Sequence, residues 1–326
     1  MKRLGNLYKN ICEYENISKV FSEVCKNTRN KRKVAMIKDY KTIYIARTYQ
    51  ILKEKKYVVG PYNKFIIYEP KKRNIYSQGM QDKIINHLVA RFILYPAILP
   101  CLLDVNVASR KNMGTSKGIE LSLEYHQKCK IKYKNYYILK CDISKFFASI
   151  DHDILKNKII KRIKDKDALK IVFDIINSNT EGLYIGSMTN QILAIFYLND
   201  MDHFIKEKLK IKYYVRYQDD FLLFHESKEY LRYCLQEIKN FLEKEKLQLN
   251  SKTRIYKNIN NFLFLGRNIK GIYSRYRNIK RKIKKRFKLY TQDKLTLNSY
   301  ISTIICYNSL CNRKNIKKSS IILLHY

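Results

Sequence analysis

Two adjacent carboxylates, Asp219 and Asp220, form the only Asp-Asp pair in a chain that contains few acidic residues. They lie in the segment Tyr213–Phe224, where apolar and aromatic residues on both sides predict two strands joined by a tight turn. Adjacent like charges repel each other, so a fold that keeps both at one turn usually offers them a divalent cation, which prefers oxygen ligands. The alternative is an ordinary polar hairpin turn, in which Asp is common.

A third carboxylate, Asp142, follows a second stretch with the pattern of a buried strand, within residues 136–147. Taken alone, Asp142 is better explained as a helix N-cap or a polar strand end. Together, however, the three carboxylates suit two-metal phosphoryl transfer. In that chemistry carboxylates from different strands hold one ion that activates the attacking oxygen and one that stabilises the leaving oxygen.

Five motifs in order give the chain a resemblance to the reverse transcriptases. Asp142 with Phe146 and Phe147 resembles the first palm motif of that family, and Tyr217–Asp220 resembles its Tyr-x-Asp-Asp box. The other three motifs lie at residues 182–191, 247–253 and 262–266. One motif would be weak support, whereas five in the family's order and spacing are specific.

The resemblance implies an α+β fold of the right-hand polymerase type. Such a fold has fingers, a palm whose antiparallel sheet is backed by helices, and a short helical thumb. It divides this chain into N-terminal helices and fingers at 1–135, a palm with interleaved finger elements at 136–270, and a basic helical thumb at 271–326. The alternation of predicted strands and helices in the middle third agrees with an α+β palm.

The same resemblance assigns the catalytic residues. It implies that Asp142, Asp219 and Asp220, with the backbone carbonyl of Ile143, hold two Mg²⁺ ions, since Mg²⁺ binds a few carboxylates together with substrate phosphates. Lys252 is expected near the leaving pyrophosphate as a general acid. A surface lysine is the equal alternative for Lys252.

Nucleotide contacts are also implied by the resemblance. Lys71 and Arg73 are expected on the incoming triphosphate, although a solvated basic turn is the alternative. Phe147 is expected to crowd the sugar 2′ position, with a core aromatic as the alternative. Gly186 would let the backbone approach a base pair closely. Gln191, counted with the nucleotide-binding residues, would contact the template or primer strand.

Tyr217, Ile185 and Gly266 are the residues implied to contact the primer and template, Gly266 at the primer-grip turn. The Ile185–Gly186 pair followed by Gln191 resembles the enzymes of diversity-generating retroelements, which copy adenines inaccurately. This chain differs from their pattern in carrying Asn190 where they have Ser.

Composition favours a polyanionic partner. The 326 residues include 66 Lys and Arg against 28 Asp and Glu, a formal net charge of +38. A coding bias toward Lys would raise the count of basic residues but would not remove the acidic ones. We therefore expect an RNA template, an RNA–DNA hybrid and dNTPs as partners, and the resemblance adds a small basic accessory protein.

Localisation is expected to be cytoplasmic. The eight cysteines include no Cys-x-x-Cys pair and read as reduced thiols. Residues 1–10 lack the apolar run of a signal peptide. The most apolar stretch, Phe92–Leu103, is short for a membrane span and contains Pro96 and Pro100, so no membrane partner is expected.

The predicted function is RNA-directed DNA synthesis by nucleotidyl transfer, most similar to error-prone cDNA synthesis in a diversity-generating retroelement. The alternatives within the class are a retron-like, group II intron-like or phage-defence reverse transcriptase. From other classes, a catalytically silent RNA-binding protein of the same fold and a template-independent nucleotidyltransferase stay open.

Overall fold

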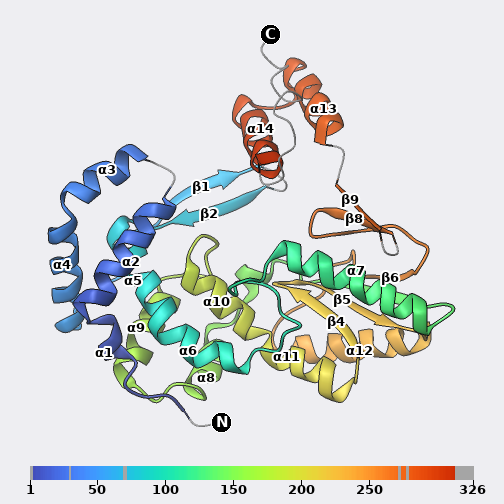
Figure 1. Ribbon diagram of the computed structural model, residues 1–326, viewed down its shortest axis with the longest axis horizontal. Coiled ribbons are helices and arrows are strands. Elements are labelled where there is room, and N and C mark those ends of the chain that lie inside the picture. Colours follow the sequence, from blue (N-terminus) through green and yellow to red (C-terminus); the bar gives the residue numbers. More distant parts are fainter. Residues whose placement is uncertain (1–2, 29–30, 69–71, 271–272, 277–278, 313–326) are drawn as a thin grey trace.

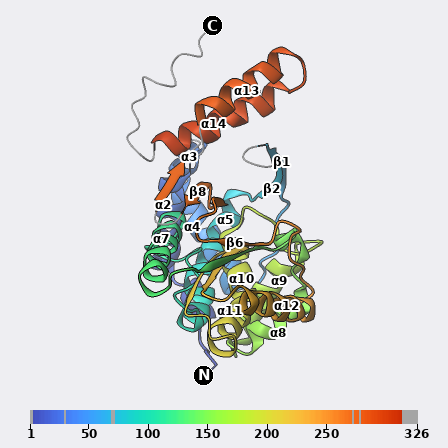
Figure 2. The same ribbon diagram turned by 90° about the vertical axis from the view of Figure 1, so that its right-hand side faces the viewer.

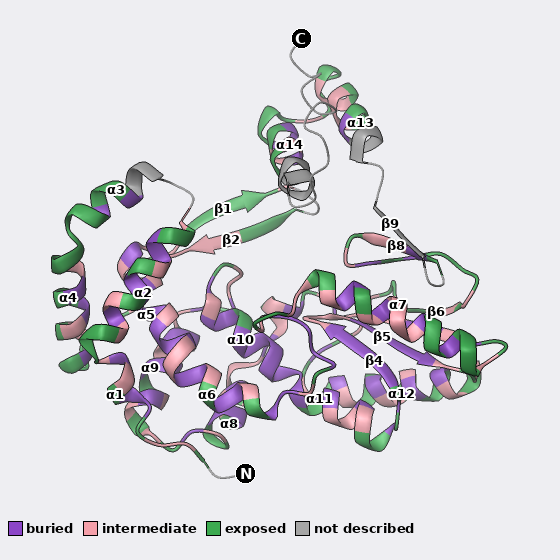
Figure 3. Cartoon of the chain, viewed as in Figure 1, coloured by how far each residue is buried: buried purple, intermediate pink, exposed green. Residues whose placement is uncertain are grey.

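Helices form the N-terminal part of the protein, and a β-hairpin extends from them. The computed structural model describes residues 3–28, 31–68, 72–270, 273–276 and 279–312 (Figure 1). The first elements are α1 (Tyr8–Ile11), α2 (Tyr14–Asn27), α3 (Lys31–Asp39), α4 (Lys41–Lys53), β1 (Asn63–Ile67) and β2 (Arg73–Ser77). β1 and β2 pair in antiparallel fashion, and all five residues of β1 are exposed. The hairpin thus projects from the helices instead of joining a larger sheet (Figures 1 and 3).

A long apolar helical run lies at the centre of this half. It comprises α5 (Met80–Val89), η1 (Ala90–Leu94), α6 (Tyr95–Ile98) and η2 (Leu99–Cys101). The 22 residues Met80–Cys101 have the length and hydropathy of a membrane span, but 56% of the most apolar window is buried within the protein. Because α2 and α10 pack against this run, we interpret it as a core helix whose apolar residues face other helices.

The palm sheet contains four antiparallel strands in the order β4-β5-β3-β6. The strands are β3 (Tyr137–Asp142), β4 (Tyr213–Tyr217), β5 (Asp220–His225) and β6 (Arg254–Lys257). α7 (Thr115–Lys132) packs on β4 and β5, and α12 (Lys228–Lys244) packs on β3 and β5 from the other side (Figure 1). α7 therefore covers one face of this sheet, although it precedes residue 136 in the sequence.

Side-chain alternation divides the sheet between two cores. Leu222 and Phe224 of β5 join the core that includes Ile119 of α7, whereas Phe221 and Leu223 join the larger core that includes Leu231 of α12. Successive residues of a strand point to opposite faces, so a sheet covered on both faces needs continuous apolar strands. The apolar run after the Asp-Asp pair has this property.

Several helical segments lie between β3 and β4 in the sequence. They are η3 (Phe146–Ser149), α8 (His152–Ile160), α9 (Lys166–Asn177), α10 (Met188–Tyr197), α11 (Asn199–His203) and η4 (Phe204–Lys208). Asp151 caps α8, its side chain accepting bonds from the amides of Asp153 and Ile154, as an Asp directly before a helix commonly does. The sequence of residues 190–209, which contains neither Gly nor Pro, predicts one long helix, but α10 ends at Tyr197 and Leu198 separates it from α11.

The C-terminal third carries a small sheet and two helices. β7 (Phe262–Phe264), β8 (Arg267–Lys270) and β9 (Tyr273–Tyr276) form an antiparallel sheet. α13 (Ile279–Thr291) and α14 (Leu297–Asn312) pack on each other and stand away from the palm (Figures 1 and 2). The N-terminal helices, the antiparallel sheets with their helices, and the terminal helix pair follow one another in the order that the predicted α+β fold requires. The division at residues 135 and 270 stays a prediction.

Candidate active site

The three candidate carboxylates lie together at one end of the palm sheet. Asp142, the last residue of β3, is the direct cross-strand partner of Asp220, the first residue of β5. The amide of Ile143 donates a hydrogen bond to the carbonyl oxygen of Asp219 at 3.3 Å. Directly opposed residues of antiparallel strands have Cβ atoms about 5 Å apart and point to the same face. Strand pairing therefore brings Asp142 next to Asp220.

A two-residue turn carries Asp219. Tyr217 pairs with Asp220, so Gln218 and Asp219 alone join β4 to β5. Gln218 has a φ of 55°, a left-handed value that the first residue of a tight hairpin turn requires. The predicted strand–turn–strand arrangement is confirmed. A non-glycine residue in this region carries backbone strain, which surrounding contacts must offset.

Lys140 acts as the counter-ion of Asp220. Its Nζ lies 2.9 Å from Asp220 Oδ1, and the two side chains are only 16% and 23% exposed. Desolvation raises the pKa of Asp220 to about 6, Lys140 opposes that shift, and the charges of Asp142 and Asp219 add to it. The acidic groups are thus close enough to repel one another, and a cation at this point relieves the repulsion.

Within the described parts of the chain, no group of three or more His, Cys, Asp or Glu side chains is arranged to hold a metal ion. The three carboxylates lie near one another without converging on one point, and one of them is paired with Lys140. By kind they suit a divalent cation, since hard cations take carboxylate and carbonyl oxygens. The residues that would hold it are Asp142, Asp219 and Asp220, with the carbonyl of Ile143. These ligand assignments stay a prediction.

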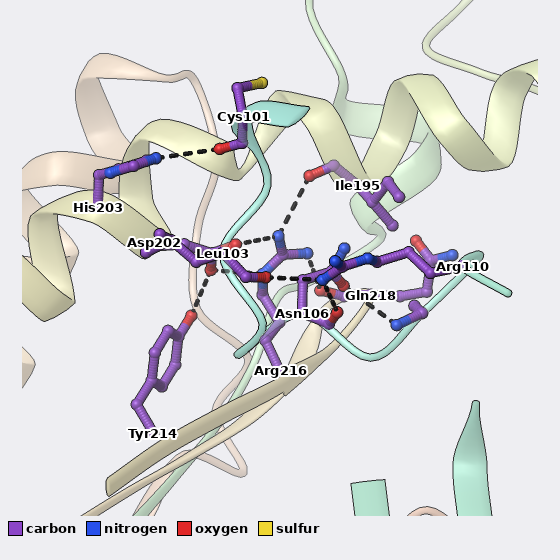
Figure 4. A network of polar contacts seen from close by, with 11 residues as sticks. Cys101, Leu103, Asn106, Arg110, Ile195, Asp202, His203, Tyr214, Arg216 and Gln218 are labelled. Carbon is purple, nitrogen blue, oxygen red and sulfur yellow. Dashed lines mark hydrogen bonds and ion pairs between the residues drawn. The ribbon is translucent and has the colours of Figure 1, made fainter. Parts of the chain in front are cut away.

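Behind the turn lies a buried ion pair, which Figure 4 shows. Arg216 of β4 and Asp202 of α11 both have fully buried side chains. Arg216 Nε donates to Asp202 Oδ1 at 2.7 Å, and Nη1 donates to the carbonyl oxygen of Gln218 at 3.0 Å. Tyr214, two residues before Arg216, belongs to the larger core, so Arg216 lies on that face of the sheet. Lys140 lies on the opposite face.

Phe147 lies in η3, half-buried, just after the end of β3. Its carbonyl oxygen accepts a hydrogen bond from the amide of Leu183 at 2.7 Å. Gly182 packs against the same carbonyl, and its own carbonyl oxygen lies 2.6 Å from His152 Nε2. The second predicted motif therefore fixes the backbone of the first, even though 35 residues separate Phe147 from Gly182 in the sequence.

The β1–β2 hairpin contacts the loop before α10. The amide of Tyr76 donates to the carbonyl oxygen of Ile185 at 2.9 Å, and the rings of Tyr76 and Tyr184 stack with centroids 3.9 Å apart. Gly186 has a φ of 136°, and a Cβ there would lie 2.3 Å from the carbonyl oxygen of Tyr76. Gly186 therefore lets the hairpin and this loop approach each other closely, while its predicted approach to a base pair stays a prediction.

Three more of the predicted site residues are exposed. Gln191 is exposed in α10, and Arg73 is exposed at the start of β2. Lys252 is exposed in a turn whose Asn250 amide donates to the carbonyl oxygen of Asp142 at 2.6 Å. This turn therefore brings Lys252 to the Asp142 end of the sheet.

Gly266 and Tyr217, two of the residues implied to contact the primer and template, lie at a turn and at a strand end. Gly266 has a φ of 77° in the β7–β8 turn, and its neighbour Leu265 approaches Gly118 of α7. Tyr217 is half-buried at the end of β4. Lys71 lies outside the described residues.

A family model described as reverse transcriptase (RNA-dependent DNA polymerase) matches residues 69–269. The chain belongs to the reverse transcriptase family. The matched region of this reverse transcriptase contains all the predicted site residues, from Lys71 to Gly266. It therefore includes the palm sheet, the hairpin strand β2 and the loop before α10.

Relatives and solved structures agree with this membership. A Saccharomyces cerevisiae protein named for intron 2 of COX1/OXI3 is 29% identical to the chain over 112 residues, which are 31% of this chain and 12% of that protein. Apo telomerase from Candida tropicalis, truncated from its C-terminal domain, matches with a TM-score of 0.52 at 15% identity, over 70% of this chain and 58% of that one.

Telomerase from Candida albicans, in complex with a TWJ fragment of telomeric RNA, matches with a TM-score of 0.52 at 13% identity, over 83% of this chain and 57% of that one. At such identities the likeness concerns the fold alone. It confirms the right-hand polymerase fold expected for this reverse transcriptase. The chain spans little more than half the length of these telomerase chains and about an eighth of the yeast protein.

Sequence reasoning did not assign roles to Lys140, Arg216 or Gly182. A signal existed for Arg216, since a charged residue inside an otherwise apolar strand needs a buried partner. Lys140 stands two residues before Asp142 and hence on the same strand face, which was also readable from the sequence. The partner of Gly182 was not readable, because its contact to Phe147 depends on how two distant loops pack.

Proposed function

We propose that this chain is an RNA-directed DNA polymerase, which extends a primer on an RNA template by nucleotidyl transfer. The observation that carries the proposal is the pairing of Asp142 with Asp220 across two strands, with Asp219 in the adjoining turn, in a chain of the reverse transcriptase family. Carboxylates that lie close together can hold the metal ions of a two-metal phosphoryl-transfer site.

Each residue has a defined part in the proposed reaction. The primer 3′ hydroxyl attacks the α-phosphate of the incoming nucleotide, and pyrophosphate leaves. Asp142, Asp219 and Asp220 would hold divalent cations, Mg²⁺ in our proposal, and the bound cations would supply activation of the attacking oxygen and stabilisation of the leaving oxygen. Lys252 donates a proton to the pyrophosphate, and Phe147 excludes a 2′ hydroxyl. Basic residues, which give the chain its charge of +38, hold the hybrid through its phosphates.

Within this class we propose error-prone copying in a diversity-generating retroelement, assisted by a small basic accessory protein. The support is the Ile185–Gly186 motif of the loop that contacts β2. A second candidate is an intron-type reverse transcriptase, and the match to the yeast intron protein favours it. Copying a defined RNA and sequencing the cDNA separates the two: frequent misincorporation opposite adenine supports the first, and faithful copying the second.

We further propose that the protein acts in the cytoplasm and without a membrane. The six cysteines whose side chains the structure describes are free thiols, and five of them are buried. Burial raises the pKa of the Cys129 thiol to about 12 and that of Cys234 to about 11. Such thiols stay protonated and unreactive, in keeping with a reducing compartment.

The decisive experiment is primer extension on a defined RNA with Mg²⁺. The intact chain should extend the primer, and Asp219→Asn should abolish extension while leaving the fold unchanged. Asp153→Asn, an exposed carboxylate in the first turn of α8, is the matched control and should extend normally. No extension by the intact chain on any template would favour a silent RNA-binding protein, and product without template would favour a template-independent transferase.

A further inference from the structure

The ion pair of Arg216 and Asp202 is the most deeply buried charged contact among the described residues, since both side chains are 0% exposed. Arg216 binds the carboxylate in bidentate fashion, through Nε to Oδ1 at 2.7 Å and through Nη2 to Oδ2. The hydroxyl of Tyr214 donates to the same carboxylate at 2.7 Å. Burying two charges costs desolvation free energy, so a buried ion pair is by itself weak evidence for stability.

The donors of Arg216 that remain reach two backbone carbonyls. Nη2 donates to Ile195 of α10 at 3.2 Å, and Nη1 donates to Gln218 at 3.0 Å (Figure 4). One guanidinium thus joins α10, α11 and the turn between β4 and β5. A planar fork can hold all these acceptors at once, whereas an ammonium group cannot.

Arg216 is itself fixed from the outer edge of the sheet. Its amide donates to the carbonyl of Val105 at 2.8 Å, and its carbonyl accepts from the amide of Val107 at 2.9 Å. The same loop reaches the turn, because the side-chain amide of Gln218 donates to Ser109 Oγ at 3.1 Å. The turn is therefore held at its carbonyl by β4 and at its side chain by the loop.

Gln218 needs such support. Its φ of 55° is in the left-handed region, which costs a non-glycine residue about 1 kcal/mol or more. The bond from Arg216 holds the carbonyl of Gln218, and this carbonyl belongs to the peptide plane shared with Asp219. Fixing that plane fixes the direction in which the Asp219 side chain leaves the backbone.

We propose that Arg216, held by Asp202, is a positioning residue that keeps the Gln218–Asp219 turn in its strained conformation. The inference rests on the proposed function only for its kinetic consequence. The effect of Arg216 on the conformation of the Gln218–Asp219 turn can be measured without catalysis. Arg216 touches neither substrate nor reacting atoms, and it acts through the backbone of Gln218.

The test compares Arg216→Lys with Tyr214→Phe. Lysine keeps a positive charge for Asp202 but loses the bond to Gln218, whereas Tyr214→Phe removes one bond to Asp202 and leaves the turn alone. In Arg216→Lys, hydrogen–deuterium exchange should rise about tenfold or more in the peptide covering residues 217–221. The extension kcat should fall about tenfold to a hundredfold, with the KM for dNTP little changed. Tyr214→Phe should lower the melting temperature and change neither readout.

Rescue of the lost kcat by a second substitution distinguishes a positioning role of Arg216 from a role in core stability alone. Glycine adopts a left-handed φ freely, so Gln218→Gly added to Arg216→Lys should restore part of the lost kcat. If the second substitution instead adds to the loss, or if exchange rises evenly over the whole palm, the proposal is wrong. Should Arg216→Lys not fold, the isosteric Asp202→Asn must give the same local rise in exchange. An intact chain that shows no extension would overturn the proposed function, while exchange would still decide the positioning role.

Discussion

Gly182 packs so closely on the carbonyl oxygen of Phe147 that a Cβ at residue 182 would lie 2.2 Å from it. Its φ of 54° is also left-handed, so two separate features require glycine there. The contact joins the loop before α10 to η3, which carries the residue expected to face the nucleotide sugar. The position of Phe147 thus depends on a glycine 35 residues away.

Gly182→Ala should therefore lower the free energy of unfolding by about 2–4 kcal/mol, from backbone strain together with overpacking. Urea unfolding measures it. Gly266→Ala is the matched control, because Gly266 has a φ of 77° but nothing within 4 Å of an added Cβ. That variant should lose only about 1 kcal/mol. Equal losses in both variants would contradict the close packing at Gly182.

Phe147→Ala should weaken the discrimination against ribonucleotides, because the smaller side chain leaves room for a 2′ hydroxyl. We expect the ratio of kcat/KM for dNTP over rNTP to fall about tenfold or more. Single-nucleotide extension on a fixed primer and template gives this ratio. Phe173→Ala, a half-buried aromatic of α9, should leave the ratio unchanged, and a similar fall in both variants would point to general loosening of the fold.

Stability should fall with acid through two histidines, the buried His126 and the half-buried His87. Desolvation lowers the pKa of His126 to about 4, and desolvation together with Lys83 and Arg91 lowers that of His87 to about 4. In the unfolded chain their pKa is about 6.5, so the unfolded state binds more protons between about pH 6.5 and about pH 4. Their contribution is complete above that range and is lost progressively as the pH falls through it.

The structure explains why His126 is held neutral. Its Nδ1 lies 3.0 Å from the hydroxyl of Tyr136, and its ring contacts Phe224 and Phe262. His126→Phe should therefore flatten the pH dependence of the free energy of unfolding between pH 6.5 and pH 4, which urea titrations at several pH values measure. Substituting the half-buried, ion-paired His203 is the contrasting variant: desolvation lowers its pKa, but the interactions that oppose desolvation, the bond to Glu207 foremost, together outweigh that effect and raise the pKa above its ordinary value. A slope unchanged by His126→Phe would show that His126 titrates normally.

RNA binding should weaken steeply with salt. With a net charge of +38, the chain is expected to neutralise several phosphates and to release their counterions. Raising the salt concentration from about 50 to about 200 mM should reduce the affinity about a thousandfold. Filter binding of an RNA–DNA hybrid measures this change. An affinity that is insensitive to salt would mean that the basic residues serve another purpose.

The hairpin with Asp219 and Asp220 was predictable because its signal is local. Apolar strands on both sides and a polar pair between them allow few other arrangements. The approach of Asp142 to that hairpin was predictable only through the family resemblance, since no local pattern gives the register of β3 on β5. The break at Leu198 was not predictable either, because residues 190–209 contain no Gly or Pro that would interrupt a helix.

Side-chain partners were the least predictable part of the site. Asp202 precedes Arg216 by fourteen residues, and their pairing follows only from the packing of α11 beneath β4. The bond between Lys140 and Asp220 likewise depends on strand register. Sequence patterns report which residues are buried and with what period, but a buried polar group finds its partner through three-dimensional packing.

The hairpin of β1 and β2 is tied to the loop before α10 by the bond between Tyr76 and Ile185 and by the stacked rings of Tyr76 and Tyr184. Any swing of the hairpin toward the palm must either break this tie or pull the loop with it. Since the amide of Leu183 in this loop also donates to the carbonyl oxygen of Phe147, a displacement of the hairpin that pulled the loop would also displace Phe147, the residue expected beside the nucleotide sugar.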